Sequence, residues 1–290
     1  MSDVFDIFLL EAVLNGLLLG GLLALLSLGL NLIFGVIDVV WICYAELIMC
    51  GMYAVYYLHV QYHWPLVIAM LAAIAIVALL GLILHQFVIR PVLSAEPINQ
   101  LLVTGGVLFF LQAAATLAFG IEFKNLGVTL ASVRLGEMSF SAARLVAFGV
   151  ALAGMLGLWL FLSRSYLGTA IRAISQDRAI MPLMGVNPAR IFALTSALGG
   201  ALAGLAACLL VLQYDIHPAI GLSFGPITFL ICVLGGLGNM VGAFIASFIL
   251  SEIISIGGVV WSTEMGYVIA FALFIVLMFI RPGGILARRQ

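Results

Sequence analysis

The chain has 290 residues, of which 65% are hydrophobic and only 8% are charged, and its mean hydropathy is +1.31. Soluble domains carry roughly 25% charged residues, so this composition excludes a soluble protein and indicates one that crosses a membrane several times. The formal net charge of −1, without a run of basic residues, does not favour a nucleic-acid partner.

Apolar stretches of about 20 residues, the length that a helix needs to cross a bilayer, recur along the chain. The N-terminus has no basic region and no small-residue cleavage site, so we expect the first stretch to be kept rather than removed as a signal peptide. Full spans are predicted near residues 9–30, 34–57, 65–89, 101–119, 144–163, 190–212 and 265–281. A further apolar region, 226–258, is interrupted by LGGLGN and predicts either two spans or a pair of broken helices.

The expected fold is therefore an all-α polytopic membrane protein in a single domain, 1–290, with about seven full spans plus a glycine-broken helical pair, giving seven to nine crossings. Basic residues set the orientation, because Lys and Arg concentrate in cytoplasmic loops. One side of the predicted map holds Arg90, Arg164, Arg172, Arg178, Arg190, Arg281, Arg288 and Arg289, and the other holds Lys124, Arg134 and Arg144. This bias predicts a cytoplasmic C-terminus, an outer N-terminus, a cytoplasmic loop at 164–190 and a periplasmic loop at 120–144, the latter either a hairpin or a surface helix.

Two carboxylates lie within the second predicted span, NLIFGVIDVVWICYAELIMCGMY. Asp38 and Glu46 are eight residues apart, so in one unbroken helix they would share a face. A charge at the bilayer centre costs about 2.5–3.5 kcal/mol on insertion scales, so both are expected to face protein, water or the inner surface. Asp38 is expected near the inner surface, and the deeper Glu46 is a candidate for a transport pathway.

The cytoplasmic loop contains residue types that commonly begin and end helices. Asp177 can cap a short helix at its N-terminus, and Gly185 can end it in the left-handed conformation. Asn187 and Pro188 then read as N-cap and first position of the next span. Two interpretations stay open: a rigid element that docks on a cytoplasmic partner, or an amphipathic loop on lipid headgroups.

Two further places invite a functional interpretation. Gly235, Gly236 and Gly238 of LGGLGN either line a pathway or a contact with another subunit, or only permit tight packing. In YDIHPAIGLSFGP, an expected outward-facing break, Asp215 and His217 are placed at the outer mouth of the pathway. The GLSFG within it formally matches G-x-S-x-G, but a nucleophile elbow needs a strand–turn–helix that the apolar context does not predict.

Six segments, in order and covering most of the chain, resemble permease subunits of branched-chain amino acid ABC importers. They are NGLLLGGLLALLSLGLNLIFGV, RPVLSAEPINQLLVTGGVLFFLQ, GTAIRAISQDRAIMPLMGV, LTSALGGALAGLAACLL, FGPITFLICVLGGLGNMVGAFIASFIL and RPGGIL. The resemblance implies a multi-pass protein of the bacterial inner membrane. It also implies an assembly with a second homologous permease as a heterodimer, two cytoplasmic ATPase subunits and a periplasmic substrate-binding protein.

The chain has no Walker A motif, so we expect no ATPase site of its own and no cofactor other than the ATP held by its partners. By the resemblance, the cytoplasmic loop couples the permease to the ATPases. The residues expected at that contact are Ala170, Arg172, Asp177, Arg178 and Gly185.

The largest departure from the family is at 41–45, where WICYA replaces the usual Asn-Phe-Ala-His-Gly. Trp41 and Tyr44 either contact a more apolar cargo, as pathway residues beside Glu46, or simply pack. The expected cargo is an amino acid, branched-chain-like, or another small organic acid or amide. The alternative is an ion-coupled secondary transporter with Glu46 or Asp215 carrying protons, although the internal repeats typical of that class are weak here.

Overall fold

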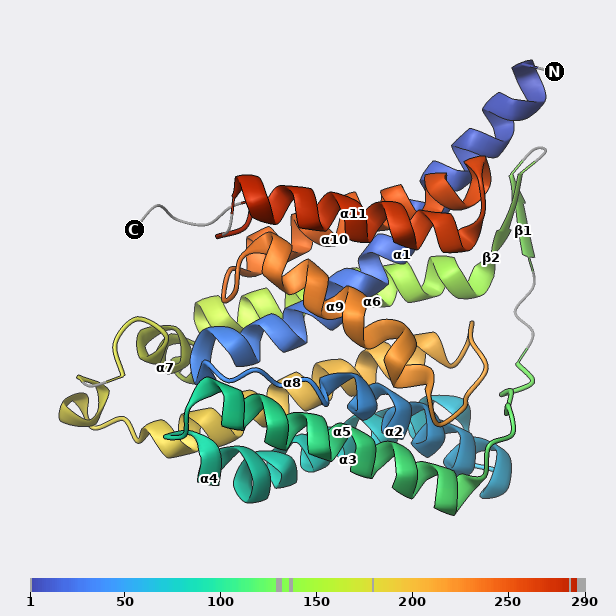
Figure 1. Cartoon of the computed structure of the whole chain (residues 1–290). Helices are drawn as coiled ribbons and strands as arrows, with labels where there is room; N and C mark the ends of the chain where they lie inside the picture. The colour runs from blue at the N-terminus through green and yellow to red at the C-terminus, as the bar shows by residue number, and fades with distance from the viewer. Residues whose placement is uncertain (1, 129–131, 136–137, 179, 282, 286–290) are drawn as a thin grey trace.

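The computed structural model describes residues 2–128, 132–135, 138–178, 180–281 and 283–285. Figure 1 shows helices running along a common direction, with the N-terminal and C-terminal ends of the chain at opposite ends of the bundle. The described residues therefore confirm the expected all-α polytopic architecture. Of the basic residues that entered the orientation prediction, Arg288 and Arg289 lie outside the described residues.

The α-helices are α1 (Ser2–Ile37), α2 (Tyr44–Tyr56), α3 (Leu66–Leu84), α4 (Arg90–Val92), α5 (Pro97–Phe119), α6 (Ala142–Arg164), α7 (Tyr166–Ile174), α8 (Pro188–Leu210), α9 (Ile220–Gly235), α10 (Met240–Val260) and α11 (Thr263–Ile280). The π-helices η1 (Tyr57–Gln61) and η2 (His85–Ile89) prolong α2 and α3, and η3 (Met181–Met184) is a 3-10 helix. Among the described residues, six helical segments are long and apolar enough to cross a membrane: Phe8–Ile37, Leu66–Val92, Pro97–Phe119, Ala142–Arg164, Pro188–Leu210 and Met240–Val260. Shorter apolar helices follow at Ile220–Gly235 and Glu264–Ile280.

Helix α1 is the centre of the bundle. It packs against α6, α8, α9 and α10, and its residues from Leu22 to Leu26 are almost fully buried. Lipid tails are as apolar as leucine, so close packing rather than hydrophobicity holds such helices together. The spacing of Gly16 and Gly20 serves this packing, because a side chain at Gly20 would lie 2.6 Å from the Ser251 hydroxyl of α10.

The loop between α5 and α6 contains a hairpin. Strand β1 (Ser132–Leu135) pairs antiparallel with β2 (Met138–Ser141), with Ser132 opposite Ser141. Of the two alternatives for this loop, the hairpin is the one observed.

The second predicted span, 34–57, is wrong as one helix. Helix α1 continues to Ile37 and then stops at Asp38, whose φ of 60° lies in the left-handed region that Asp tolerates better than most residues. Residues 38–43 are largely without helical structure before α2 begins. Asp38 and Glu46 therefore do not share a face of one helix.

Non-helical chain at membrane depth is tolerated where protein groups satisfy its polar atoms. Here distant side chains do so. The hydroxyl of Thr104 on α5 donates a hydrogen bond to the Val40 carbonyl at 2.9 Å, and Arg178 Nη2 donates to the Val36 carbonyl, also at 2.9 Å.

The LGGLGN segment forms a turn rather than a break inside a helix. It joins α9 to α10 at the end of the bundle that carries α7 (Figure 1). Gly236 and Gly238 adopt φ values of 96° and 80°, which glycine reaches without the steric cost of a side chain. Just beside the turn, Gly235 and Gly242 bring the two backbones together, and neither position has room for a Cβ atom. The region 226–258 is thus two helices packed in close contact.

Candidate transport pathway and coupling site

Helix α7 is held firmly against the bundle. The Ser165 hydroxyl caps its N-terminus by accepting a hydrogen bond from the Gly168 amide at 2.8 Å. Its buried face consists of Gly168, Ala170, Ile171 and Ile174. Ala170 therefore faces the bundle and fixes the helix in place, whereas Arg172 is exposed on the other side.

In the 164–190 loop the predicted roles of Gly185 and Asn187 are confirmed, whereas Asp177 does not cap the short helix as predicted, because the N-cap of η3 is Ile180 and no side chain caps it. Asp177 Oδ1 accepts a hydrogen bond from the Ile180 amide at 3.2 Å. Gly185 ends η3 with φ 78°, and its amide donates to the Pro182 carbonyl at 3.1 Å. Asn187 caps α8 by accepting from the Ala189 amide at 3.0 Å. The loop is therefore an ordered element with one α-helix and one 3-10 helix.

This loop presents apolar side chains outward. Leu183 is 85% exposed and Met184 is 72% exposed, both on η3 at the tip of the loop. Large exposed apolar groups outside the spanning helices are typical of a surface that contacts another protein.

Arg178 links the loop to the end of α1. Beyond its hydrogen bond to the Val36 carbonyl, its guanidinium lies 5.2 Å from the ring centre of Phe192 on α8. A cation at the C-terminus of a helix complements both the free carbonyls and the helix dipole. The loop is thereby anchored one residue from Ile37, where α1 stops and the 38–43 segment starts.

A cavity of about 980 Å³ lies at this junction. Asp38, Arg178, Gly236 and Gly238 all line it, so the structure brings together residues predicted from three separate stretches of sequence. Gly235 does not line it, because it is buried in the contact between α9 and α10.

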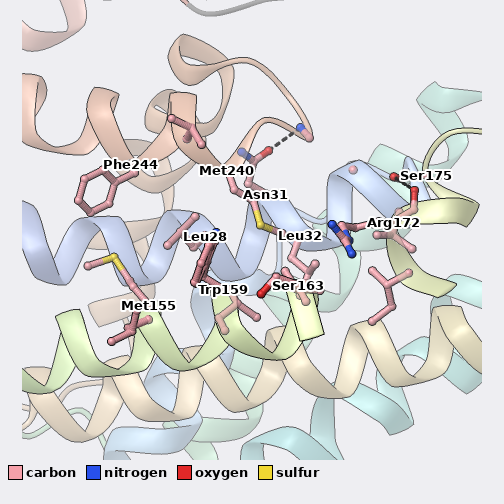
Figure 2. A pocket seen from close by; sticks show the side chains of 18 of the residues that line it. Leu28, Asn31, Leu32, Met155, Trp159, Ser163, Arg172, Ser175, Met240 and Phe244 are labelled. Carbon is pink, nitrogen blue, oxygen red and sulfur yellow. Dashed lines mark hydrogen bonds between the residues drawn. The ribbon is translucent and has the colours of Figure 1, made fainter. Parts of the chain in front are cut away.

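Asn31 fixes one wall of this cavity and was missed by the sequence analysis. Its Oδ1 accepts a hydrogen bond from the Gly238 amide at 2.6 Å, and its Nδ2 donates to the Asn239 carbonyl at 2.8 Å. Figure 2 shows Asn31 among the apolar side chains of a second cavity, of about 550 Å³, between α1, α6 and α10, with Arg172 at one end. A polar amide inside an apolar span was the available signal.

We expect Asn31→Ala to lower the free energy of unfolding by about 1–3 kcal/mol, because the Gly238 amide and the Asn239 carbonyl lose their partners. The measurement is thermal unfolding in detergent. Ser27→Ala is the control one turn earlier in α1, because the buried Ser27 hydroxyl only bonds the Ala24 carbonyl of its own helix. Equal losses for the two variants would contradict the role given to Asn31.

The divergent segment forms one side of a third cavity, of about 330 Å³. Trp41, Tyr44 and Ala45 face α5 and α9 there. Trp41 is 1% exposed, and its Nε1 donates to the Cys43 sulfur at 2.7 Å. The Tyr44 hydroxyl donates to the Gly199 carbonyl of α8 at 3.2 Å. Both aromatic residues thus pack into the bundle and also contribute to the cavity wall.

Tyr44→Phe is expected to cost about 0.5–1.5 kcal/mol of unfolding free energy, the net value of one hydrogen bond, with transport retained. Tyr53→Phe is the control, because the buried Tyr53 hydroxyl has no hydrogen-bond partner among the described residues and its removal should cost nothing. Thermal unfolding of the two variants gives the comparison. A loss of transport in a stable Tyr44→Phe variant would contradict a packing role.

Glu46 is the most unusual polar group in the spanning region. It lies in the first turn of α2 and is 0% exposed. Neither carboxyl oxygen has a hydrogen-bond partner among the described residues. Across the helix interface the carboxyl faces Gly221 of α9, where a Cβ atom would lie 2.6 Å from Oε1.

Asp215 and His217 lie together in the loop between α8 and α9. Asn125 Nδ2 donates to Asp215 Oδ1 at 2.6 Å, and the rings of Phe123 and His217 are 4.8 Å apart. Burial lowers the pKa of His217, and the neighbouring Asp215 carboxylate opposes that shift. The two residues thus join the loop after α5 to the loop before α9, at the opposite end of the bundle from α7 (Figure 1).

The helical bundle, its ordered loop and its helices long and apolar enough to cross a membrane define a multi-pass α-helical membrane protein. Residues 12–278 match the family model described as "Branched-chain amino acid transport system / permease component". The chain belongs to this family, and it is a permease component rather than an enzyme.

Curated relatives agree with that assignment. The chain is 33% identical to the high-affinity branched-chain amino acid transport system permease protein BraD of Pseudomonas aeruginosa, over 97% of this chain and 96% of the relative. It is 32% identical to the corresponding LivH protein of Escherichia coli K12, over 100% and 99% of the two chains. The probable branched-chain amino acid transport permease protein LivH of Methanocaldococcus jannaschii is 24% identical, over 86% and 80%. No solved structure matches the chain significantly.

Proposed function

We propose that this chain is the membrane permease of an ATP-driven importer, and that it forms half of the pathway for a branched-chain amino acid or a similar small solute. The family membership, over nearly the whole chain, is the observation that carries the proposal. ATP-dependent uptake in proteoliposomes tests it. Vanadate should abolish uptake and a protonophore should leave it intact. The reverse result would favour an ion-coupled transporter.

The proposed assembly lies in the bacterial inner membrane and contains a second, homologous permease as a heterodimer partner, two cytoplasmic ATPase subunits and a periplasmic binding protein. The α7 end is the cytoplasmic end in this proposal, because the exposed arginines of the 164–190 loop gather there. The N-terminus and the Asp215–His217 loop are then outside, where that loop is a contact for the binding protein and its cargo.

The cytoplasmic loop is the proposed contact with an ATPase. Arg172 and Arg178 supply charge, Asp177 and Gly185 shape the loop, and the exposed Leu183 supplies apolar area. Buried Ala170 contributes by keeping α7 in place. The ordered caps support this role, because only a stiff element can transmit a push from a soluble subunit.

The double change Arg172→Ala plus Asp177→Ala tests the contact. We expect uptake and substrate-stimulated ATPase activity to fall at least tenfold in the assembled complex, because the loop loses charge and the hydrogen bond from the Ile180 amide to Asp177 that shapes it. Arg164→Ala, at the exposed end of α6, is the control and should change neither activity. Normal uptake and stimulation in the double variant would exclude this role for the loop.

A further inference from the structure

We propose that the 330 Å³ cavity between the 40–45 segment and α9 receives the apolar side chain of an amino-acid substrate, and that Glu46 binds the substrate's ammonium group. This inference rests on the proposed function and adds a specific recognition site within the permease itself. It assigns the buried carboxyl of Glu46 a ligand of defined chemistry.

The cavity suits an aliphatic side chain. Its volume lies within the range of roughly 300–1,000 Å³ that is typical of small-molecule sites. The apolar part of its wall comes from the 40–45 segment, α5 and α9 and includes Val40, Ile42, Leu101, Leu108, Leu222 and Phe229. The hydroxyls of Tyr44 and Thr228 on the wall already donate to backbone carbonyls, so the cavity offers an apolar ligand few competing polar groups.

Glu46 supplies the polar end of the site. A buried carboxylate is stable only when cations or hydrogen-bond donors compensate it, and the described part of this chain gives Glu46 neither. The substrate's ammonium group offers three donors and a positive charge, which is the chemistry that the carboxylate lacks.

The carboxyl and the cavity are neighbours. Gly221 lines the cavity, and the Glu46 carboxyl contacts the same residue from the side of α2. A small separation of α2 from α9 at Gly221 would therefore join the carboxyl to the cavity. The missing side chain of Gly221 is what keeps the two so close.

The N-terminus of α2 provides a place for the carboxylate group of an amino-acid substrate. Tyr44 and Ala45, the first residues of α2, line the cavity, and no side chain caps this helix end. The Tyr44 and Glu46 amides already donate to the Trp41 and Cys43 carbonyls, so this end offers a ligand chiefly its helix dipole. The partial positive charge of a helix N-terminus stabilises an anion by about 0.3–1 kcal/mol when exposed and more when buried. The substrate carboxylate, one carbon from the ammonium group, is the anion that this end would hold.

The test compares leucine with 4-methylpentanoate, which has the same aliphatic chain and carboxylate but no ammonium group. Equilibrium binding of each radiolabelled probe is measured on the importer purified with its second permease and its ATPases, without binding protein. We expect the wild-type complex to bind leucine at least tenfold more tightly than 4-methylpentanoate. Glu46→Gln should weaken leucine binding at least tenfold and leave 4-methylpentanoate binding unchanged.

Two further variants separate recognition from general damage. Glu252→Gln alters another carboxyl with a buried oxygen that has no hydrogen-bond partner among the described residues, on α10, and should bind both probes as the wild type does. Leu222→Trp narrows the cavity and should shift preference from leucine toward alanine. ATPase activity and size-exclusion elution report whether each variant is folded and assembled.

Leucine binding by an assembled Glu46→Gln complex at the wild-type level would overturn the proposal. So would a wild-type complex that binds leucine no better than 4-methylpentanoate. A wrong proposed function can be distinguished from a wrong assignment of the Glu46 site. If the chain were not an importer permease for leucine, wild-type proteoliposomes would show no ATP-dependent leucine uptake at all.

Discussion

Gly242→Ala is expected to destabilise the protein strongly, although it adds only a single methyl group. The new Cβ atom would overlap the Gly235 carbonyl oxygen, which is a backbone atom of a packed helix and cannot move aside as a flexible side chain does. Overpacking usually costs about 1–3 kcal/mol and occasionally more, and we expect at least about 3 kcal/mol here. Thermal unfolding in detergent and the yield of monodisperse protein measure the effect.

Gly105→Ala on α5 is the matched control. No atom lies within 4 Å of the Cβ position at Gly105, and alanine favours the helix over glycine by about 1 kcal/mol. This variant should be at least as stable as the wild type. If the two variants unfolded at the same temperature, the contact between α9 and α10 could not be as tight as the structure shows.

Arg178→Ala is expected to uncouple ATP hydrolysis from transport. The variant loses a charged hydrogen bond to the Val36 carbonyl, about 1.5–3 kcal/mol, together with the contact to the Phe192 ring. The loop then loses its link to the end of α1. Uptake and substrate-stimulated ATPase activity should fall at least tenfold, while basal ATPase activity and assembly remain.

Two further variants test whether the effect is specific to Arg178 and to its guanidinium group. Arg190→Ala removes an exposed arginine from the first turn of α8 and should leave coupling intact. Arg178→Lys keeps the charge and N–H donors but not the planar guanidinium, so it should recover part of the stimulation. Full coupling in Arg178→Ala would show that the hydrogen bond to Val36 does not carry the signal.

Local chemistry made much of the fold predictable. Gly185 and Asn187 act within a few residues of their own position, so capping rules located them correctly. The length and apolarity of the spanning helices could also be predicted from the sequence, because a bilayer imposes both on it.

The break after α1 was not predictable, because its causes are distant in sequence. Residues 36–42 are mostly apolar and look like the middle of a span. Two carbonyls there, those of Val40 and Val36, accept hydrogen bonds from Thr104 on α5 and from Arg178 in the loop between α7 and α8. Similarly, the sequence marked Glu46 as a deep carboxylate, but its contact with Gly221 depends on the packing of α2 against α9.

The non-helical 38–43 segment has a mechanical consequence. A helix resists bending through its regular ladder of backbone hydrogen bonds, whereas two of the hydrogen bonds that hold this stretch come from side chains distant in sequence, Arg178 just before it and Thr104 within it. Force applied at the α7 end of the bundle therefore concentrates its deformation in these few residues instead of spreading along rigid helices. The stretch acts as a compliant joint, and its movement carries Trp41, which lines the 330 Å³ cavity.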